Sequence, residues 1–152
     1  YLENFVQAIF DTCQLEGGTL VLGGDGRFLN SEASVTILRM AAANGVAKVV
    51  TMPDFLASTP SVSMLVRKIK ANGAIILTAS HNPGGPKEDF GIKYNTENGG
   101  PAPSGVTDAI YERTKQITSY KIVESTPPLS SFTAPNKFKL GDMEVEVVDV
   151  VS

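Results

Sequence analysis

Apolar residues along the chain follow two periods, and their alternation predicts helices separated by short buried strands. In residues 2–13 an apolar residue recurs every three or four positions, which is typical of an amphipathic helix. Ser31 is a preferred helix cap, and Gly45 is a stop signal after the apolar spacing that follows it. Thr59 and Pro60 form a helix start, as cap and first helical residue. The predicted helices are residues 2–13, 31–44, 59–69 and 104–117.

Short unbroken apolar runs lie between these helices and predict strands buried on both faces. The connection after the third run is too short for a crossover helix, so we expect the fourth strand to be antiparallel to its neighbour. Residues 126–137 are rich in turn formers and have no clear period, whereas residues 143–151 alternate and end in a β-branched run. The predicted strands are residues 19–22, 46–51, 74–77, 90–94 and 143–151.

The alternation of strands and helices is typical of a sheet covered by helices on both faces. We therefore predict an α/β fold: a three-layer α/β/α domain with a mixed, mostly parallel sheet of about four strands. A length of 152 residues suits a single domain, residues 1–152. The 42% hydrophobic and 19% charged residues allow a proper core and argue against disorder.

The net charge and the cysteine content limit which binding partners and which cellular compartment are expected for the protein. A formal net charge of -3 gives no basic face for nucleic acid, and no apolar run is long enough to span a membrane. Cys13 is the only cysteine, so no intrachain disulfide can form and a reducing, cytoplasmic compartment is expected. Because Cys13 falls on the apolar stripe of its helix, we expect it to act as a small buried hydrophobe.

The candidate functional residues lie in the loops that follow three predicted strands. Open parallel sheets bind ligands beyond the carboxyl ends of their strands, so these loops are where a binding site is expected. The first of these loops carries Arg27, the second is residues 54–59, and the third carries Ser80 beside His81, the only histidine. Pro83 keeps the preceding residue out of the helical region. A surface loop whose serine has no special function would also account for Ser80 beside His81. A hydrolase is not indicated, since the Gly-x-Ser-x-Gly elbow is absent.

The sequence of the third loop is more specific than its composition. Residues 78–86 (TASHNPGGP) and 89–95 (DFGIKYN) closely resemble the phosphoserine loop of phosphoglucomutases, which belong to the α-D-phosphohexomutase superfamily. The resemblance covers nearly the whole chain and is weakest from 124 to 140. Further segments similar to the family, in family order, are residues 23–28, 41–45, 56–60 and 98–103.

This resemblance implies a role for each matching residue. Ser80 matches the serine that is phosphorylated in the resting enzyme, and its phosphate would be a ligand of Mg²⁺. His81 matches an active-site histidine linked to proton transfer or sugar positioning. Lys93 matches a lysine near the transferring phosphoryl group. Arg27 matches an arginine that supports the substrate or phosphate, although a solvated or structural role for Arg27 stays open.

The implied reaction interconverts glucose 1-phosphate and glucose 6-phosphate, with glucose 1,6-bisphosphate as the activating intermediate. Enzymes of this kind have four domains, and the remaining magnesium ligands and the sugar-reading loops belong to the other three. We therefore expect this chain to be the N-terminal domain (domain I), with the other domains of the same polypeptide as its partners. We expect it to be inactive alone, and the family's first strand to precede Tyr1.

Two alternatives remain from the same residues. One is a related mutase that acts on mannose or glucosamine phosphates, although the Gly-Gly-Pro at residues 84–86 favours the glucose branch. The other is a non-catalytic phosphoprotein with the same fold, which would keep the Ser80 loop and lose the metal and sugar loops.

Overall fold

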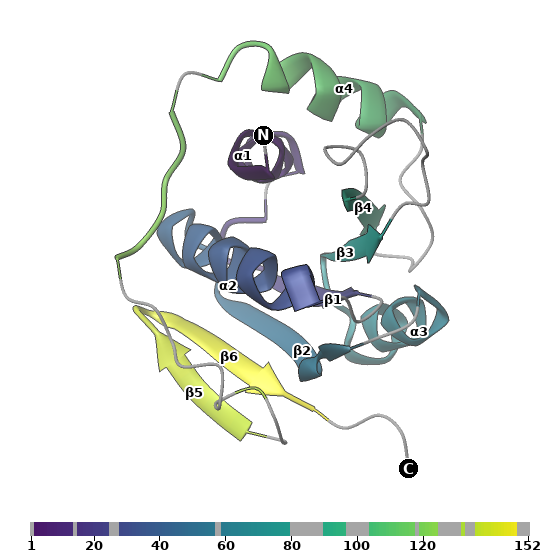
Figure 1. The fold of residues 1–152 in the computed structure, drawn as a ribbon, viewed down its shortest axis with the longest axis vertical. Helices are drawn as coiled ribbons and strands as arrows, with labels where there is room; N and C mark the ends of the chain where they lie inside the picture. The colour runs from purple at the N-terminus through teal and green to yellow at the C-terminus, as the bar shows by residue number, and fades with distance from the viewer. Residues whose placement is uncertain are drawn as a thin grey trace.

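A computed structural model gives the fold of the chain (Figure 1). It describes residues 2–13, 15–24, 28–56, 59–79, 90–96, 104–117, 119–124, 132 and 136–148. The elements in chain order are α1 (Leu2–Cys13), β1 (Thr19–Gly24), α2 (Phe28–Ala43), β2 (Lys48–Leu56), α3 (Thr59–Ile69), β3 (Gly73–Ala79), β4 (Phe90–Thr96), α4 (Ser104–Thr114), β5 (Asn136–Leu140) and β6 (Met143–Val147).

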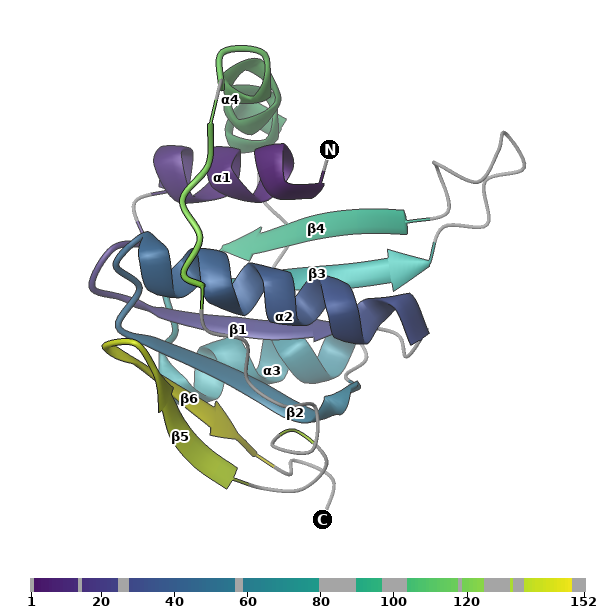
Figure 2. The ribbon, with the colours of Figure 1, turned by 60° about the vertical axis from the view of Figure 1, so that its left-hand side comes forward.

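The strands form a mixed sheet in the order β4-β3-β1-β2-β6-β5. The four inner strands are parallel to one another, while the two edge strands, β4 and β5, are antiparallel to their neighbours. Figure 2 shows the four inner strands running in one direction, and α2 and α3 pack on opposite faces of the sheet at β1. The three-layer α/β/α fold and the antiparallel fourth strand are thus confirmed.

Alternation along the buried strands divides the core between the two faces of the sheet. In β1, Leu20 and Leu22 belong to the apolar cluster with α1 and α2, whereas Val21 belongs to the cluster with α3. Successive side chains of a strand point to opposite faces, so a strand covered on both sides reads as a continuous apolar run. α4 packs on α1 rather than on the sheet (Figure 1).

The sheet has six strands in the described part of the chain, so the expected number of about four was too low. Strand β6 confirms the late strand, but β5 overlaps the segment that was expected to be turn-rich. In β5 the apolar residues are only Phe138 and Leu140, too few for a clear local signal. Pairing with β6 across the tight turn at Gly141, whose φ is 62°, supplies the stability that the local pattern lacks.

Three element boundaries also differ from expectation. Helix α2 begins at Phe28, so Ser31 lies inside its first turn and is not the cap. Strand β2 continues to Leu56, beyond the expected end at residue 51, because it follows β1 past an irregularity in their pairing. Helix α4 ends at Thr114 and is followed by turns, so the apolar residue Ile117 does not belong to it.

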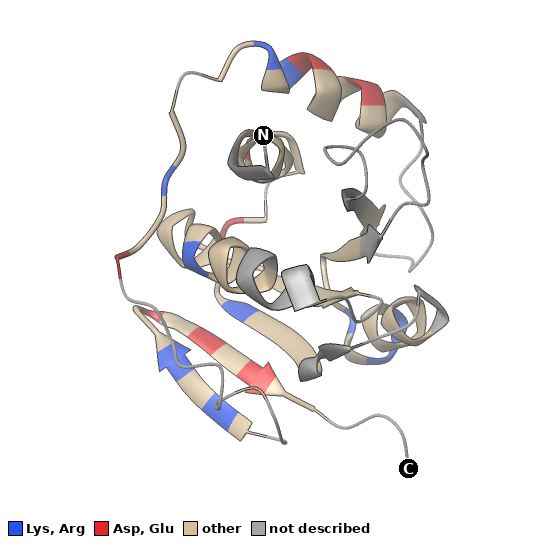
Figure 3. Ribbon diagram, in the orientation of Figure 1, with Lys and Arg blue, Asp and Glu red and all other residues tan. Residues whose placement is uncertain are grey.

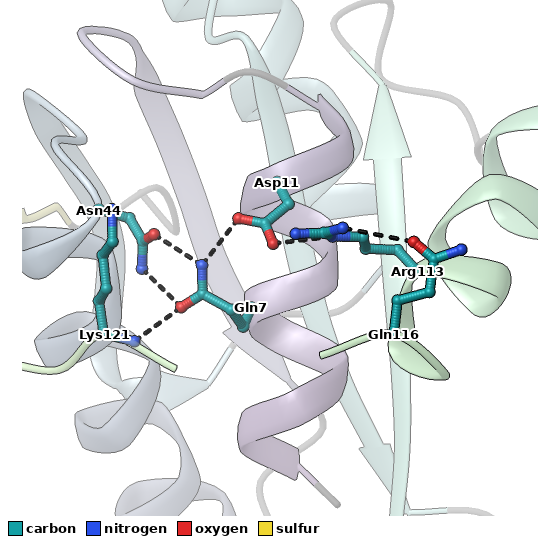
Figure 4. A network of polar contacts seen from close by, with 6 residues as sticks. All are labelled: Gln7, Asp11, Asn44, Arg113, Gln116 and Lys121. Carbon is teal, nitrogen blue, oxygen red and sulfur yellow. Dashed lines mark hydrogen bonds and ion pairs between the residues drawn. The ribbon is translucent and has the colours of Figure 1, made fainter. Parts of the chain in front are cut away.

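A buried polar network joins α1 to its neighbours (Figure 4). Gln7 is 4% exposed. Its Nε2 donates to Asp11 Oδ1 and Asn44 Oδ1, and its Oε1 accepts from Asn44 Nδ2 and from the backbone N–H of Lys121. Asp11 also accepts a hydrogen bond from Arg113 Nε of α4. The network therefore fixes α2, α4 and the segment around Lys121 against one helix.

Cys13 behaves as expected from its place on the apolar stripe of α1. It is half-buried and packs against the core on the α1 and α2 side of the sheet. Burial raises the pKa of its thiol, and a hydrogen bond with Tyr94 opposes that shift. The thiol is therefore protonated at neutral pH, which is the state of an unreactive structural cysteine.

Candidate functional site

Strands β1, β2 and β3 end at the same edge of the sheet. Gly24 of β1 pairs with Leu56 of β2 on one side and with Leu77 of β3 on the other. Each of these strand ends leads into one of the three segments in which the sequence predicts chemistry. This carboxyl edge, seen at the right of Figure 2, is therefore the candidate site.

The predicted serine segment connects two paired strands. Ala79 ends β3, and it lies opposite Phe90, the first residue of β4. Ser80 and His81 come directly after Ala79, and Arg27 directly precedes α2. All three lie outside the described residues, so their roles stay predictions.

Lys93 is the expected site residue that falls inside a described element. Its backbone lies in β4, opposite Ile76 of β3, in a ladder that continues without a break from Ala79–Phe90 to Gly73–Thr96. The ladder fixes the backbone of Lys93 relative to the residue that precedes Ser80. A shift of one register position would move Lys93 to the opposite face of the sheet.

Thr51 supports the same edge and was missed by the sequence analysis. Its side chain is fully buried, and its Oγ1 donates a 2.7 Å hydrogen bond to the carbonyl oxygen of Leu22, where the pairing of β1 and β2 becomes irregular. Pro53 follows closely in β2 and has no N–H to give to the ladder. The threonine hydroxyl therefore supplies a donor to β1 just before its end. A threonine followed by proline within an apolar strand is the only signal that the sequence offered.

Charged residues of β2, β6 and β5, whose positions are coloured on the ribbon in Figure 3, form a separate cluster of ion pairs. Lys48 Nζ lies 2.8 Å from Glu146 Oε1 and 3.2 Å from Glu144 Oε2. The hydrogen bond to Glu146 raises the pKa of Lys48, and the hydrogen bond from Lys48 lowers the pKa of Glu144. Because Lys48 is the first residue of β2, the cluster lies toward the opposite edge of the sheet and contributes to strand pairing.

The described ranges provide neither a metal centre nor a membrane span. They contain no group of three or more histidine, cysteine, aspartate or glutamate side chains that could hold a metal ion. No helix within the same ranges is long and apolar enough to cross a bilayer.

The fold and the motif of residues 78–86 place the chain in the class of phosphohexomutase α/β/α domains. The sequence profile of "Phosphoglucomutase/phosphomannomutase, alpha/beta/alpha domain I" matches residues 1–121. The chain therefore belongs to the phosphoglucomutase/phosphomannomutase family and contains its domain I.

Similar proteins of known name are phosphoglucomutases. The chain is 51% identical over 153 residues to a phosphoglucomutase of Rhizobium radiobacter and 52% identical over 165 residues to "Probable phosphoglucomutase, cytoplasmic 2" of Arabidopsis thaliana. These matches cover 100% and 98% of this chain, but 28% of each relative. The chain therefore spans little more than a quarter of the length of these relatives.

Two solved structures share the fold. The open form of pp63/parafusin, an exocytosis-sensitive phosphoprotein and phosphoglucomutase from Paramecium, matches with a TM-score of 0.85 and 40% identity over 99% of this chain and 30% of that protein. A putative phosphomannomutase from Thermus thermophilus matches with a TM-score of 0.64 and 27% identity, over 86% of this chain and 29% of that protein. Both likenesses again cover one domain of a longer polypeptide.

Proposed function

We propose that this chain is the phosphoserine-bearing N-terminal domain of a phosphoglucomutase that interconverts glucose 1-phosphate and glucose 6-phosphate. The main support is the identity of about one half, over the whole chain, to proteins named phosphoglucomutase. The position of residue 80, directly after a buried strand at the carboxyl edge, agrees with a site that meets a ligand.

The phosphoryl group travels on Ser80 in this proposal. The bond between phosphorus and Ser80 Oγ breaks, a bond to a sugar hydroxyl oxygen forms, and the hydroxyl proton passes to a base. The product of this half-reaction is glucose 1,6-bisphosphate. The sugar then presents its other phosphate: the bond between that phosphorus and the sugar oxygen breaks, a bond to Ser80 Oγ forms, and the base returns its proton to the sugar oxygen. Positioning and charge neutralisation supply most of the catalysis in such transfers.

The remaining expected residues have distinct roles around Ser80. His81 is the candidate for the base or for positioning the sugar, and a well-placed base contributes about 10²–10⁴-fold. Lys93 supplies positive charge near the transferring phosphoryl group, which acts most strongly where water is excluded. Arg27 supports the substrate or its phosphate from the segment that follows β1.

Magnesium is the expected cofactor, and this chain's ligand to it would be the phosphate on Ser80. Phosphate oxygens are favoured Mg²⁺ ligands, and a bound ion would neutralise part of the phosphate charge. The other ligands and the sugar-reading loops would come from further domains of the same polypeptide. This agrees with the 28% of the relatives' length that the chain spans. Neither nucleic acid nor membrane is expected as a partner, and we propose a cytoplasmic location, the one named for the Arabidopsis relative.

The alternatives differ in sugar and in catalysis. A phosphomannomutase or phosphoglucosamine mutase is less well supported, because identity to the Thermus protein is 27%, against 51% to the Rhizobium phosphoglucomutase. A non-catalytic phosphoprotein would carry phosphate on Ser80 without turnover. The comparison of labelling with turnover in the next experiment separates the non-catalytic phosphoprotein from a phosphoglucomutase.

The test replaces Ser80 with alanine in the full-length protein and follows phosphoryl label from glucose 1,6-bisphosphate. We expect wild-type protein to be labelled at Ser80 and to convert glucose 1-phosphate to glucose 6-phosphate. Ser80→Ala should lose both label and turnover, because the carrier oxygen is gone. It should keep its fold, since the change removes one hydroxyl group and leaves both described apolar clusters unchanged.

Ser61→Ala, in the first turns of α3, is the control. It loses a serine hydroxyl as well, and it should keep the label. Label that persists in Ser80→Ala, or that disappears in a folded Ser61→Ala, would overturn the assignment of Ser80 as the carrier. Label on Ser80 without turnover would support the phosphoprotein alternative instead.

A further inference from the structure

Asn95 is a buried amide on β4, which is an edge strand of the sheet formed by the described residues. It is 3% exposed, and it lies in β4 opposite Ala74 of β3. A buried amide without hydrogen bonds costs about 1–3 kcal/mol, whereas an apolar residue at such a position carries no such cost. The amide at this position therefore calls for an explanation in terms of its partners.

One hydrogen-bond partner of Asn95 lies outside the sheet, on helix α3. Asn95 Nδ2 donates a 3.2 Å hydrogen bond to Ser63 Oγ. α3 packs mainly on β1 and β3, with Val62 and Val66 in the apolar cluster below it. The hydrogen bond between Asn95 and Ser63 therefore joins α3 to β4, a strand that lies outside the main contact area of this helix.

The same bond joins elements that border two segments of the carboxyl edge. α3 begins at Thr59, directly after residues 57–58, and Ser63 lies about one turn into the helix. β4 begins at Phe90, directly after residues 80–89, and Lys93 precedes Asn95 by two positions. A displacement of β4 that moves Asn95 must also move the backbone of Lys93.

We propose that Asn95 and Ser63 are positioning residues for phosphoryl transfer, and that their hydrogen bond holds β4, and with it Lys93, in place against α3. This inference rests on the proposed function, because it assigns to Lys93 a role in the transfer. The ladder with β3 fixes β4 within the plane of the sheet. The side-chain bond to α3 fixes the strand in the direction out of that plane.

The experiment measures kcat and KM for glucose 1-phosphate in the full-length protein and in S63A, S63T, N95A and the double variant S63A/N95A. A misplacement of about 1 Å lowers a catalysed rate by up to about 10²-fold. We expect S63A to lower kcat at least about fivefold with KM within about twofold, because Lys93 acts on the transferring group. S63T keeps a hydroxyl and should restore kcat to within about twofold of wild type.

The double variant tests whether the two side chains act together. Residues that share one interaction give non-additive effects, so S63A/N95A should be no more than about twofold slower than the slower single variant. Val66→Ala on the same helix is the stability control, since it removes fully buried apolar volume without touching the bond. It should lower the melting temperature and leave kcat within about twofold of wild type.

The outcomes separate this inference from the proposed function. If wild-type protein turns over and is labelled at Ser80, while S63A keeps a kcat within about twofold of wild type, the positioning role is wrong and the function stands. Additive losses in S63A and N95A, or an equal loss of kcat in Val66→Ala, also overturn the positioning role. If wild-type protein neither turns over nor takes label, both fail. Should N95A not fold, the comparison of S63A with S63T decides.

Discussion

Replacing Gln7 with leucine removes the centre of the polar network in Figure 4 while keeping a side chain of similar size. Gln7 takes part in four hydrogen bonds, two with Asn44 and one each with Asp11 and Lys121. A typical hydrogen bond contributes about 0.5–1.5 kcal/mol net, and a buried partner left without one costs about 1–3 kcal/mol. Asn44 is half-buried and Lys121 exposed, so water can replace part of the loss.

These terms give an expected loss of about 2–3 kcal/mol in the free energy of unfolding. For a chain of this size, 1 kcal/mol corresponds to about 2–4 °C, so the melting temperature should fall by about 4–12 °C. The measurement is thermal and urea unfolding of the 152-residue chain, followed by circular dichroism.

Arg113→Ala is the matched control, because it removes the exposed part of the same network. Its ion pair with Asp11 is 3.1 Å long, with side chains 45% and 29% exposed. Such pairs contribute at most about 1 kcal/mol. A Gln7→Leu variant within about 0.5 kcal/mol of wild type, or an Arg113→Ala variant that loses as much as Gln7→Leu, would refute the view that buried amide bonds hold these helices together.

Two further predictions concern the sheet. A Cβ at Gly73 would lie 2.8 Å from Cζ of the Tyr94 ring, so Gly73→Ala should lower the free energy of unfolding in urea by about 1–3 kcal/mol. Gly105→Ala in α4 is the control and should be neutral or stabilising, because nothing lies within 4 Å of its added Cβ. Equal effects of the two substitutions would contradict the packing argument. The hydrogen bond from Lys48 holds the pKa of Glu144 below its usual value of 4.5. Wild type should therefore be more stable than Lys48→Met at pH 7, and this difference in the free energy of unfolding should disappear as the pH falls through the lowered pKa of Glu144. A difference between wild type and Lys48→Met that stays constant from pH 7 to about pH 3 would show that the ion pair is not its cause.

Local patterns predicted the features that depend on neighbouring residues in the sequence. The apolar run before Ser80 and the short connection after it were sufficient to predict a parallel strand followed by an antiparallel one, as β3 and β4 show. The predicted helix start was confirmed to within one residue, since α3 begins at Thr59, which was expected to be its cap. Such a start could be predicted because its signals act within a single turn.

Features that depend on distant residues could not be predicted in this way. Gln7 meets the backbone of Lys121, far along the chain, and no local period indicates such a contact. Asn95 looks like an ordinary polar position on an edge strand until α3 supplies Ser63 as its partner. Strand β5 likewise exists because β6 pairs with it. In each case the stabilising group comes from an element that the sequence does not place.

The pairing of β3 with β4 gives a physical reason why the segment between these two strands suits the proposed phosphoserine. The segments after β1 and β2 lead into helices, so each is tied to the sheet at one end. The segment at 80–89 has both ends in one ladder, at Ala79 and Phe90. A residue that must give and recover a phosphoryl group needs the same position in both half-reactions, since small displacements cost orders of magnitude in rate. The ladder fixes both ends of the segment that would carry the phosphoryl group, and its register also fixes how far along the strand Lys93 stands from Ala79, the residue before Ser80. The register of β3 with β4 is therefore as much a requirement of the proposed reaction as the identity of either residue.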